Sequence, residues 1–164
     1  MGPEEKLSWL GTVAPWAQAS QQDTGVPACV TLAQAILESN WGQSKLSREA
    51  FNYFGIKPFR ASDPYIEMTT TEYDRGRPLK VLARFRRFAS PKECFEFRGR
   101  WLSRSQRYAP CMEVKDDPLE FCARLAQCGY ATDPEYAKKL VAVILAFDLQ
   151  KFDLPPGPAG KAEA

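Results

Sequence analysis

The chain has 164 residues, of which 45% are hydrophobic and 12% aromatic, so it is long enough for one domain with a real core and too short for two ordinary ones. Its net charge of +2 argues against a polycation built to bind nucleic acid. The absence of histidine excludes His-dependent triads, Cys-His proteases and the usual His-bearing zinc hydrolase sites.

The five cysteines are odd in number and form no Cys-x-x-Cys pair, which is typical of small buried apolar residues: Cys29, Cys94, Cys111, Cys122 and Cys128. One disulfide is possible, a metal site is improbable, and we expect no cofactor. No run is long or apolar enough to span a membrane, and the first residues lack the features of a secretory signal. We therefore expect either a trimmed export segment or another route out of the cell.

Residues 7–22 carry apolar side chains at helical spacing, among them Leu10 and Val13, and this pattern predicts one or two helices broken near Pro15. Gly25 is expected to end this segment, because helices commonly end at a glycine. Pro27 is then expected in the first turn of the next helix, where a proline is well tolerated.

The segment 29–42 is apolar almost all round when placed on a helix, which predicts a buried helix with one polar sector of Thr31, Gln34 and Glu38. Glu38 lies in the last turn before Gly42, at the edge of the core and at the negative end of the helix dipole. Both effects are expected to raise its pKa, and a carboxyl that keeps its proton near neutral pH suits a general acid. The alternative is a glutamate that caps a surface helix or pairs with an arginine.

Residues 44–50 predict a short helix, and residues 52–57 predict a compact loop with an aromatic pair. Residues 65–88 alternate in polarity on either side of a turn over 74–78, which predicts a β-hairpin with a somewhat long loop. Glu72 lies near its tip, on the face shared with Ile66, Met68 and Thr70. It is either a second catalytic carboxylate or an exposed charge at the rim that forms an ion pair with an arginine.

The last third predicts three helices, because Ser90-Pro, Asp117-Pro and Asp133-Pro are each typical of a helix start. The third of these helices is expected to turn Leu140, Val141, Ile144, Leu145 and Phe147 inward. Residues 154–164 lack an apolar period, so we expect a catalytic domain over 1–153 and a disordered Pro/Gly/Ala tail over 154–164.

Positive charge is concentrated in residues 75–107, which hold eleven Lys or Arg against two glutamates. One face is therefore expected to be basic, which suits an anionic polymer, although a solvated charged face is the commoner explanation.

Five segments, in this order, resemble the glucosaminidase family of bacterial cell-wall hydrolases, glycoside hydrolase family 73. They are AQAILESNWG (33–42), NYFGIK (52–57), TTTEY (69–73), FRRFAS (85–90) and GYATDPEYAKKL (129–140). The resemblance implies an α+β, lysozyme-like domain, mostly helical, with a small β-hairpin lobe beside a substrate groove. Asn40 departs from the glycine common in this motif, which affects the turn before Trp41.

The activity that the resemblance implies is an endo-β-N-acetylglucosaminidase, which cleaves peptidoglycan after N-acetylglucosamine. Glu38 falls on the family's general acid, Glu72 on its second carboxylate, and Tyr130 on an aromatic that flanks the cleaved sugar. The candidate substrate-binding residues are Trp41, Asn52, Tyr53, Phe54, Lys57 and Tyr73, with packing as the alternative for the aromatic ones. Lys57 and Arg84 are further candidates to meet the carboxylates of the peptide stems.

Two other functions remain as alternatives, namely an N-acetylmuramidase that cuts the alternate bond and a non-catalytic peptidoglycan-binding module. The expected partner is the peptidoglycan glycan strand, without nucleic acid and without membrane insertion, and the expected state is a monomer. The expected place of action is the cell wall, reached from the periplasm, from outside or by phage release.

Overall fold

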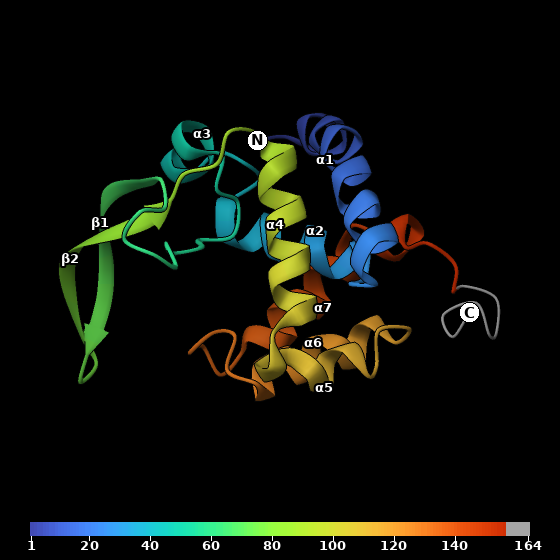
Figure 1. Cartoon of the computed structure of the whole chain (residues 1–164). Coiled ribbons are helices and arrows are strands. Elements are labelled where there is room, and N and C mark those ends of the chain that lie inside the picture. The colour runs from blue at the N-terminus through green and yellow to red at the C-terminus, as the bar shows by residue number, and fades with distance from the viewer. Residues whose placement is uncertain (157–164) are drawn as a thin grey trace. The chain divides into compact units, whose positions relative to one another are not determined.

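The computed structural model describes residues 1–156 and is mostly helical, with one two-stranded antiparallel sheet (Figure 1). The predicted α+β class is confirmed. The chain divides into two compact units, Met1–Gln34 with Gly99–Ala164 and Ala35–Arg98. Of the tail expected over 154–164, the part from residue 157 onward lies outside the described residues. Among the described residues, no helix combines the length and the apolar character needed to cross a bilayer.

The first unit opens with α1 (Pro3–Thr24), which is continuous, so the predicted break near Pro15 is wrong. Pro15 has no N–H to donate to the Gly11 carbonyl. Both residues are exposed, so this carbonyl lies on the solvent side of the helix. The opposite side is held by buried residues such as Val13 and Ala17. Gly25 ends the helix at φ 86°, as predicted, and donates its N–H to a carbonyl in the last turn.

Helix α2 (Ala28–Ser39) begins in the first unit and ends in the second. Pro27 lies just before the first helical residue, one position earlier than predicted. Its carbonyl accepts a hydrogen bond from Thr31 N–H at 3.1 Å. Asp153 Oδ1 accepts the Cys29 N–H at 2.7 Å and so satisfies one of the free donors at this helix start. The predicted burial is confirmed, and it includes the polar side chains of Thr31 and Gln34.

The predicted helix starts at Ser90 and Asp117 are confirmed, because each side chain accepts the N–H three residues later. The elements are α4 (Pro91–Arg104), η1 (Gln106–Tyr108), α5 (Ala109–Met112), α6 (Pro118–Gln127), α7 (Tyr136–Ala146) and η2 (Leu149–Phe152). Helix α7 begins three residues after Asp133, whose carboxylate instead accepts the Glu135 N–H in the preceding turn. Leu145 was predicted to face inward and is 62% exposed.

The second unit contains α3 (Lys45–Ala50), β1 (Tyr65–Asp74) and β2 (Arg77–Arg86). The strands pair from Tyr65↔Arg86 to Asp74↔Arg77, so only Arg75 and Gly76 form the turn, and the somewhat long loop predicted here is wrong. Both turn residues have positive φ, 51° and 78°, as in the mirror-image turns that suit the twist of a hairpin.

All five cysteines are free, and four of them are buried, as predicted for small apolar residues. Burial raises the pKa of the Cys94 and Cys122 thiols to about 12, so both remain protonated at neutral pH.

Candidate functional site

Glu38 lies in the last turn of α2, where the sequence places it, but its side chain is exposed. The expectation that the core edge partly buries this carboxyl is therefore wrong. The turn that follows is built by Ser39, whose hydroxyl donates to Ala35 O at 2.6 Å and accepts the Gly42 N–H at 2.8 Å. These bonds hold the backbone next to Glu38 in a defined conformation.

The turn after Glu38 contains two consecutive non-glycine residues in the left-handed region, Asn40 at φ 49° and Trp41 at φ 60°. Asparagine tolerates this region better than most residues, which explains how it can stand where the family commonly has glycine. The turn directs the Trp41 side chain inward, where only 7% of it is exposed. Trp41 therefore packs in the core instead of facing a ligand.

The NYFGIK segment is organised by Asn52, which is 1% exposed. Its Nδ2 donates to Ile56 O at 2.8 Å and to Arg86 O at 2.9 Å, and its Oδ1 accepts the N–H groups of Phe54 and Ile56. All the amide's usual hydrogen-bonding positions are thus occupied. Asn52 positions the loop and the end of β2, which leaves it no group for direct contact with a sugar.

The two aromatic residues of this segment differ in exposure. Phe54 is 4% exposed and contacts the Phe95 ring, with 5.0 Å between centroids, so it is a packing residue. Tyr53 is half-buried, and burial, together with the neighbouring Cys94 thiol, raises the pKa of its phenol. Its hydroxyl therefore remains a proton donor. Lys57 is exposed at the end of the segment.

Glu72 lies opposite Leu79 near the tip of the hairpin. The register places it on one face with Thr70, Met68 and Ile66, as the alternation predicts, and those three side chains are half-buried while Glu72 is exposed. Tyr73 pairs with Pro78 in the strand, and its side chain lies outside what the structure describes.

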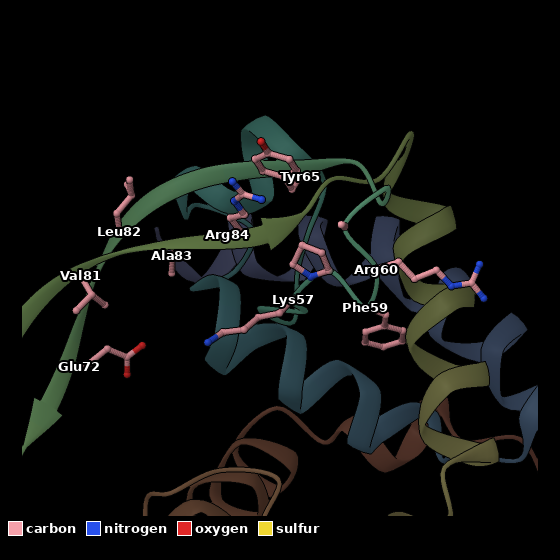
Figure 2. A pocket seen from close by; sticks show the side chains of 11 residues that line it. Lys57, Phe59, Arg60, Tyr65, Glu72, Val81, Leu82, Ala83 and Arg84 are labelled. Carbon is pink, nitrogen blue, oxygen red and sulfur yellow. The ribbon is translucent and has the colours of Figure 1, made fainter.

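A pocket of about 550 Å³ opens between the loop after NYFGIK and the hairpin (Figure 2). Its lining combines the predicted residues Lys57, Glu72 and Arg84 with residues that the sequence analysis missed: Pro58, Phe59, Arg60, Ala61, Tyr65, Val81, Leu82 and Ala83. The dipeptide Phe59-Arg60, which follows the recognised motif after Pro58, is a signal in the sequence that could have pointed to this loop.

Tyr130 belongs to the first unit and is half-buried in a cluster of aromatic rings. It stacks on Tyr136, with centroids 5.8 Å apart and planes 8° apart, and it also contacts Trp101 and Tyr108. The Arg107 guanidinium donates to Cys128 O at 2.8 Å and to Gly129 O at 2.7 Å, which holds the backbone just before Tyr130. The other candidate residues lie in the second unit.

No group of three or more Cys, Asp and Glu side chains within residues 1–156 is arranged to hold a metal ion.

Comparison with known proteins identifies one family over most of the chain. The glucosaminidase family model, described as mannosyl-glycoprotein endo-beta-N-acetylglucosaminidase, matches residues 14–149. Peptidoglycan hydrolase FlgJ of Escherichia coli K12 is 38% identical over 147 residues, covering 87% of this chain and 47% of that protein. Exo-glucosaminidase LytG of Bacillus subtilis 168 is 31% identical over 155 residues, covering 92% of this chain and 54% of that protein.

Among solved structures, the catalytic domain of the autolysin Auto from Listeria monocytogenes superimposes with a TM-score of 0.79 at 29% identity. The match covers 93% of this chain and 90% of that domain. The chain thus spans about half the length of the two curated relatives but nearly all of a separate catalytic domain.

Proposed function

Because the chain belongs to the glucosaminidase family, we propose that it is a peptidoglycan hydrolase, an endo-β-N-acetylglucosaminidase that cleaves the glycan strand after N-acetylglucosamine. The observation that supports this most strongly is the family match over residues 14–149, a range that includes Glu38, Glu72 and Tyr130. Its place of action would be the cell wall, where the substrate is found.

Glu38 is the proposed general acid. Glycosidic cleavage needs a proton on the leaving oxygen while positive charge develops at the anomeric carbon. The exposure of Glu38 leaves its carboxyl accessible to a glycosidic oxygen, and the Ser39 bonds hold its backbone in place. The proton passes from Glu38 to the leaving sugar, the C–O bond breaks, and water supplies the new hydroxyl and returns a proton to the enzyme.

Glu72 is the proposed second carboxylate, and three roles are open to it. It acts as the base for the attacking water, as the nucleophile, or as the group that steadies the substrate's own N-acetyl oxygen. The anomeric configuration of the first product, read by NMR, separates these routes. Inversion indicates the base, and retention indicates one of the other two. Tyr130 is proposed to stack on the cleaved sugar or hydrogen-bond to it.

The mode of attack has a second candidate, because the relative from Bacillus subtilis is named an exo-glucosaminidase. An endo enzyme shortens long strands early and clears a wall suspension quickly, whereas an exo enzyme releases small saccharides from strand ends while the strands stay long. Size analysis of soluble glycan during the first tenth or so of digestion tests this choice.

The deciding experiment is digestion of purified peptidoglycan followed by borohydride reduction and mass spectrometry. Reduced N-acetylglucosamine at the new ends supports the proposal, reduced N-acetylmuramic acid identifies a muramidase, and binding without new ends identifies a non-catalytic module. The Glu38→Gln variant should lose activity by at least about a hundredfold with its fold intact, as for loss of a general acid. Glu49→Gln makes the same charge change on an exposed residue of α3 and is the matched control.

A further inference from the structure

Gln34 is a fully buried polar side chain on helix α2. Its Nε2 donates a hydrogen bond to the Tyr136 hydroxyl at 2.9 Å, although 102 positions of sequence separate the two residues. Its Oε1 is buried and has no hydrogen-bond partner among the described residues. Burying an amide without satisfying both of its ends costs stability, and an apolar side chain of similar length would avoid that cost. Core packing alone therefore does not explain a glutamine at this position.

Tyr136, the partner of Gln34, is the first residue of α7 and is 4% exposed. Its N–H donates to Asp133 O at 3.1 Å, and its hydroxyl accepts the bond from Gln34. Its ring lies nearly parallel to the Tyr130 ring, with planes 8° apart. Because Tyr136 is held at its backbone and at its hydroxyl, it offers Tyr130 a surface with a defined position.

The backbone at Tyr130 is also held, since its N–H donates to Leu125 O at 3.0 Å. A fixed backbone does not determine where the ring lies, because the side chain still rotates about two bonds. The rings packed around Tyr130 make that choice. Tyr108 and Trp101 contact it at tilts of 52° and 50°, whereas Tyr136 stacks on it. The plane of the Tyr130 ring therefore follows that of Tyr136.

We propose that Gln34 and Tyr136 are positioning residues that act on the reaction through Tyr130. The inference rests on the proposed function, in which Tyr130 contacts the cleaved sugar. The contacts run from the Gln34 amide to the Tyr136 hydroxyl and from the Tyr136 ring to the Tyr130 ring, all within the first unit. A ring that is held in one orientation before the substrate arrives loses less conformational freedom on binding, and a misplaced one slows the reaction.

The first experiment is a double-mutant cycle that measures kcat and KM for new reducing ends on soluble glycan strands. Gln34→Met keeps the length of the side chain and removes the donor, and Tyr136→Phe keeps the ring and removes the acceptor. We expect each substitution to lower kcat by about tenfold when Tyr130 is present. In a Tyr130→Ala background, assayed at high enzyme concentration, each should change kcat by a factor near one, because no ring is left to position.

Ile144→Val is the matched control. It removes one buried methyl group from α7, about two turns beyond Tyr136, and leaves both partners of the Gln34 bond in place. Its effect on kcat should be the same in both backgrounds. If Gln34→Met does not fold, the double variant with Tyr136→Phe replaces it, because neither partner of the bond is then left unpaired. A Gln34→Met or Tyr136→Phe effect of equal size in both backgrounds, or an unchanged kcat, overturns the proposal.

The second measurement does not depend on activity. NMR of isotope-labelled tyrosine rings observes Tyr130 directly, with its signals assigned by their loss in Tyr130→Phe. Gln34→Met should move these signals, because the ring current of the stacked Tyr136 changes with its position, whereas Ile144→Val should leave them in place. Unmoved Tyr130 signals in Gln34→Met overturn the inference while leaving the hydrolase intact. A native enzyme that releases no new reducing ends refutes the proposed function itself.

Discussion

The Asp63 carboxylate lies 2.8 Å from the Arg86 guanidinium, which joins the loop after NYFGIK to strand β2. The same carboxylate oxygen accepts two backbone N–H groups of that loop. This carboxylate therefore ties the loop wall of the pocket to strand β2.

Asp63→Asn should loosen this loop. The amide carries no charge to hold Arg86 and is a weaker acceptor for the two N–H groups. We expect faster hydrogen exchange at the Phe59 and Arg60 amides. Asp116→Asn, at an exposed position of the first unit, is the control that makes the same charge change.

The pH dependence of the same loop follows from the pKa of Asp63. The hydrogen bond from Arg60 N–H, followed by the one from Phe59 N–H and the charge of Arg86, lowers the pKa of this carboxyl below its ordinary 3.8. A group with a lowered pKa in the folded state stabilises the fold fully above its ordinary pKa, and the contribution is lost as pH falls through the lowered value. The protection of the Phe59 and Arg60 amides should therefore be constant above about pH 5 and decline below pH 3.8. A decline centred above pH 5 would contradict this assignment.

Asn52→Ala should destabilise the fold by about 2–4 kcal/mol, because it leaves several buried backbone groups without the hydrogen-bond partner that the amide provides. Asn52→Asp is the sharper variant. It keeps the acceptor for two N–H groups but places an oxygen against the carbonyls of Ile56 and Arg86. Urea unfolding measures both, with Gln127→Ala, at an exposed position of α6, as the control. Equal stability of Asn52→Asp and the native protein would refute the role assigned to Nδ2.

Gly99→Ala should be destabilising by about 1–3 kcal/mol, as overpacking usually is. A Cβ at this position would lie 2.1 Å from Ser20 Oγ and 3.4 Å from Ser20 Cβ, inside the first unit. The double variant Ser20→Ala/Gly99→Ala removes the closest atom and should recover most of the loss. Gly11→Ala is the opposite control, since nothing lies within 4 Å of its Cβ, and it should stabilise α1 by up to about 1 kcal/mol.

Arg75→Asn should stabilise the hairpin by a few tenths to about 1 kcal/mol, because asparagine accepts the left-handed region with less strain than arginine. Gly76→Ala should do the reverse, since φ at this position is 78°. Thermal unfolding of the two variants beside the native protein gives the sign of each effect. Because both turn residues have positive φ, the two substitutions must change the stability in opposite directions.

The sequence predicted the elements whose signals are local. Ser90 and Asp117, each followed by proline, predicted their helix starts correctly, and the polarity alternation around Glu72 predicted its face of the hairpin. These signals need only neighbours three residues away or a period of two. The position of Glu38 in the last turn of its helix was predicted for the same reason.

The wrong predictions concern solvent exposure and contacts between residues distant in the sequence, which no local pattern contains. Pro15 was expected to break α1, but tolerance of a proline depends on which side of the helix faces water. Periodicity assigned Leu145 to the interior and Glu38 to the edge of the core, but it gives only a direction around the helix and not what covers it. Phe59, Arg60 and Leu82 reach the pocket through the loop and the strand pairing, so single-sequence reasoning could not place them together.

The pairing of β1 with β2 also restricts how homologous chains can vary in length here. Deleting one residue between Tyr65 and Glu72 would shift the later part of the strand by one step and turn its carboxylate to the opposite side of the ribbon, unless a bulge absorbed the change. Deleting two would preserve the side and shorten the arm. Insertions and deletions in this arm should therefore occur in even numbers among chains that keep the carboxylate in use.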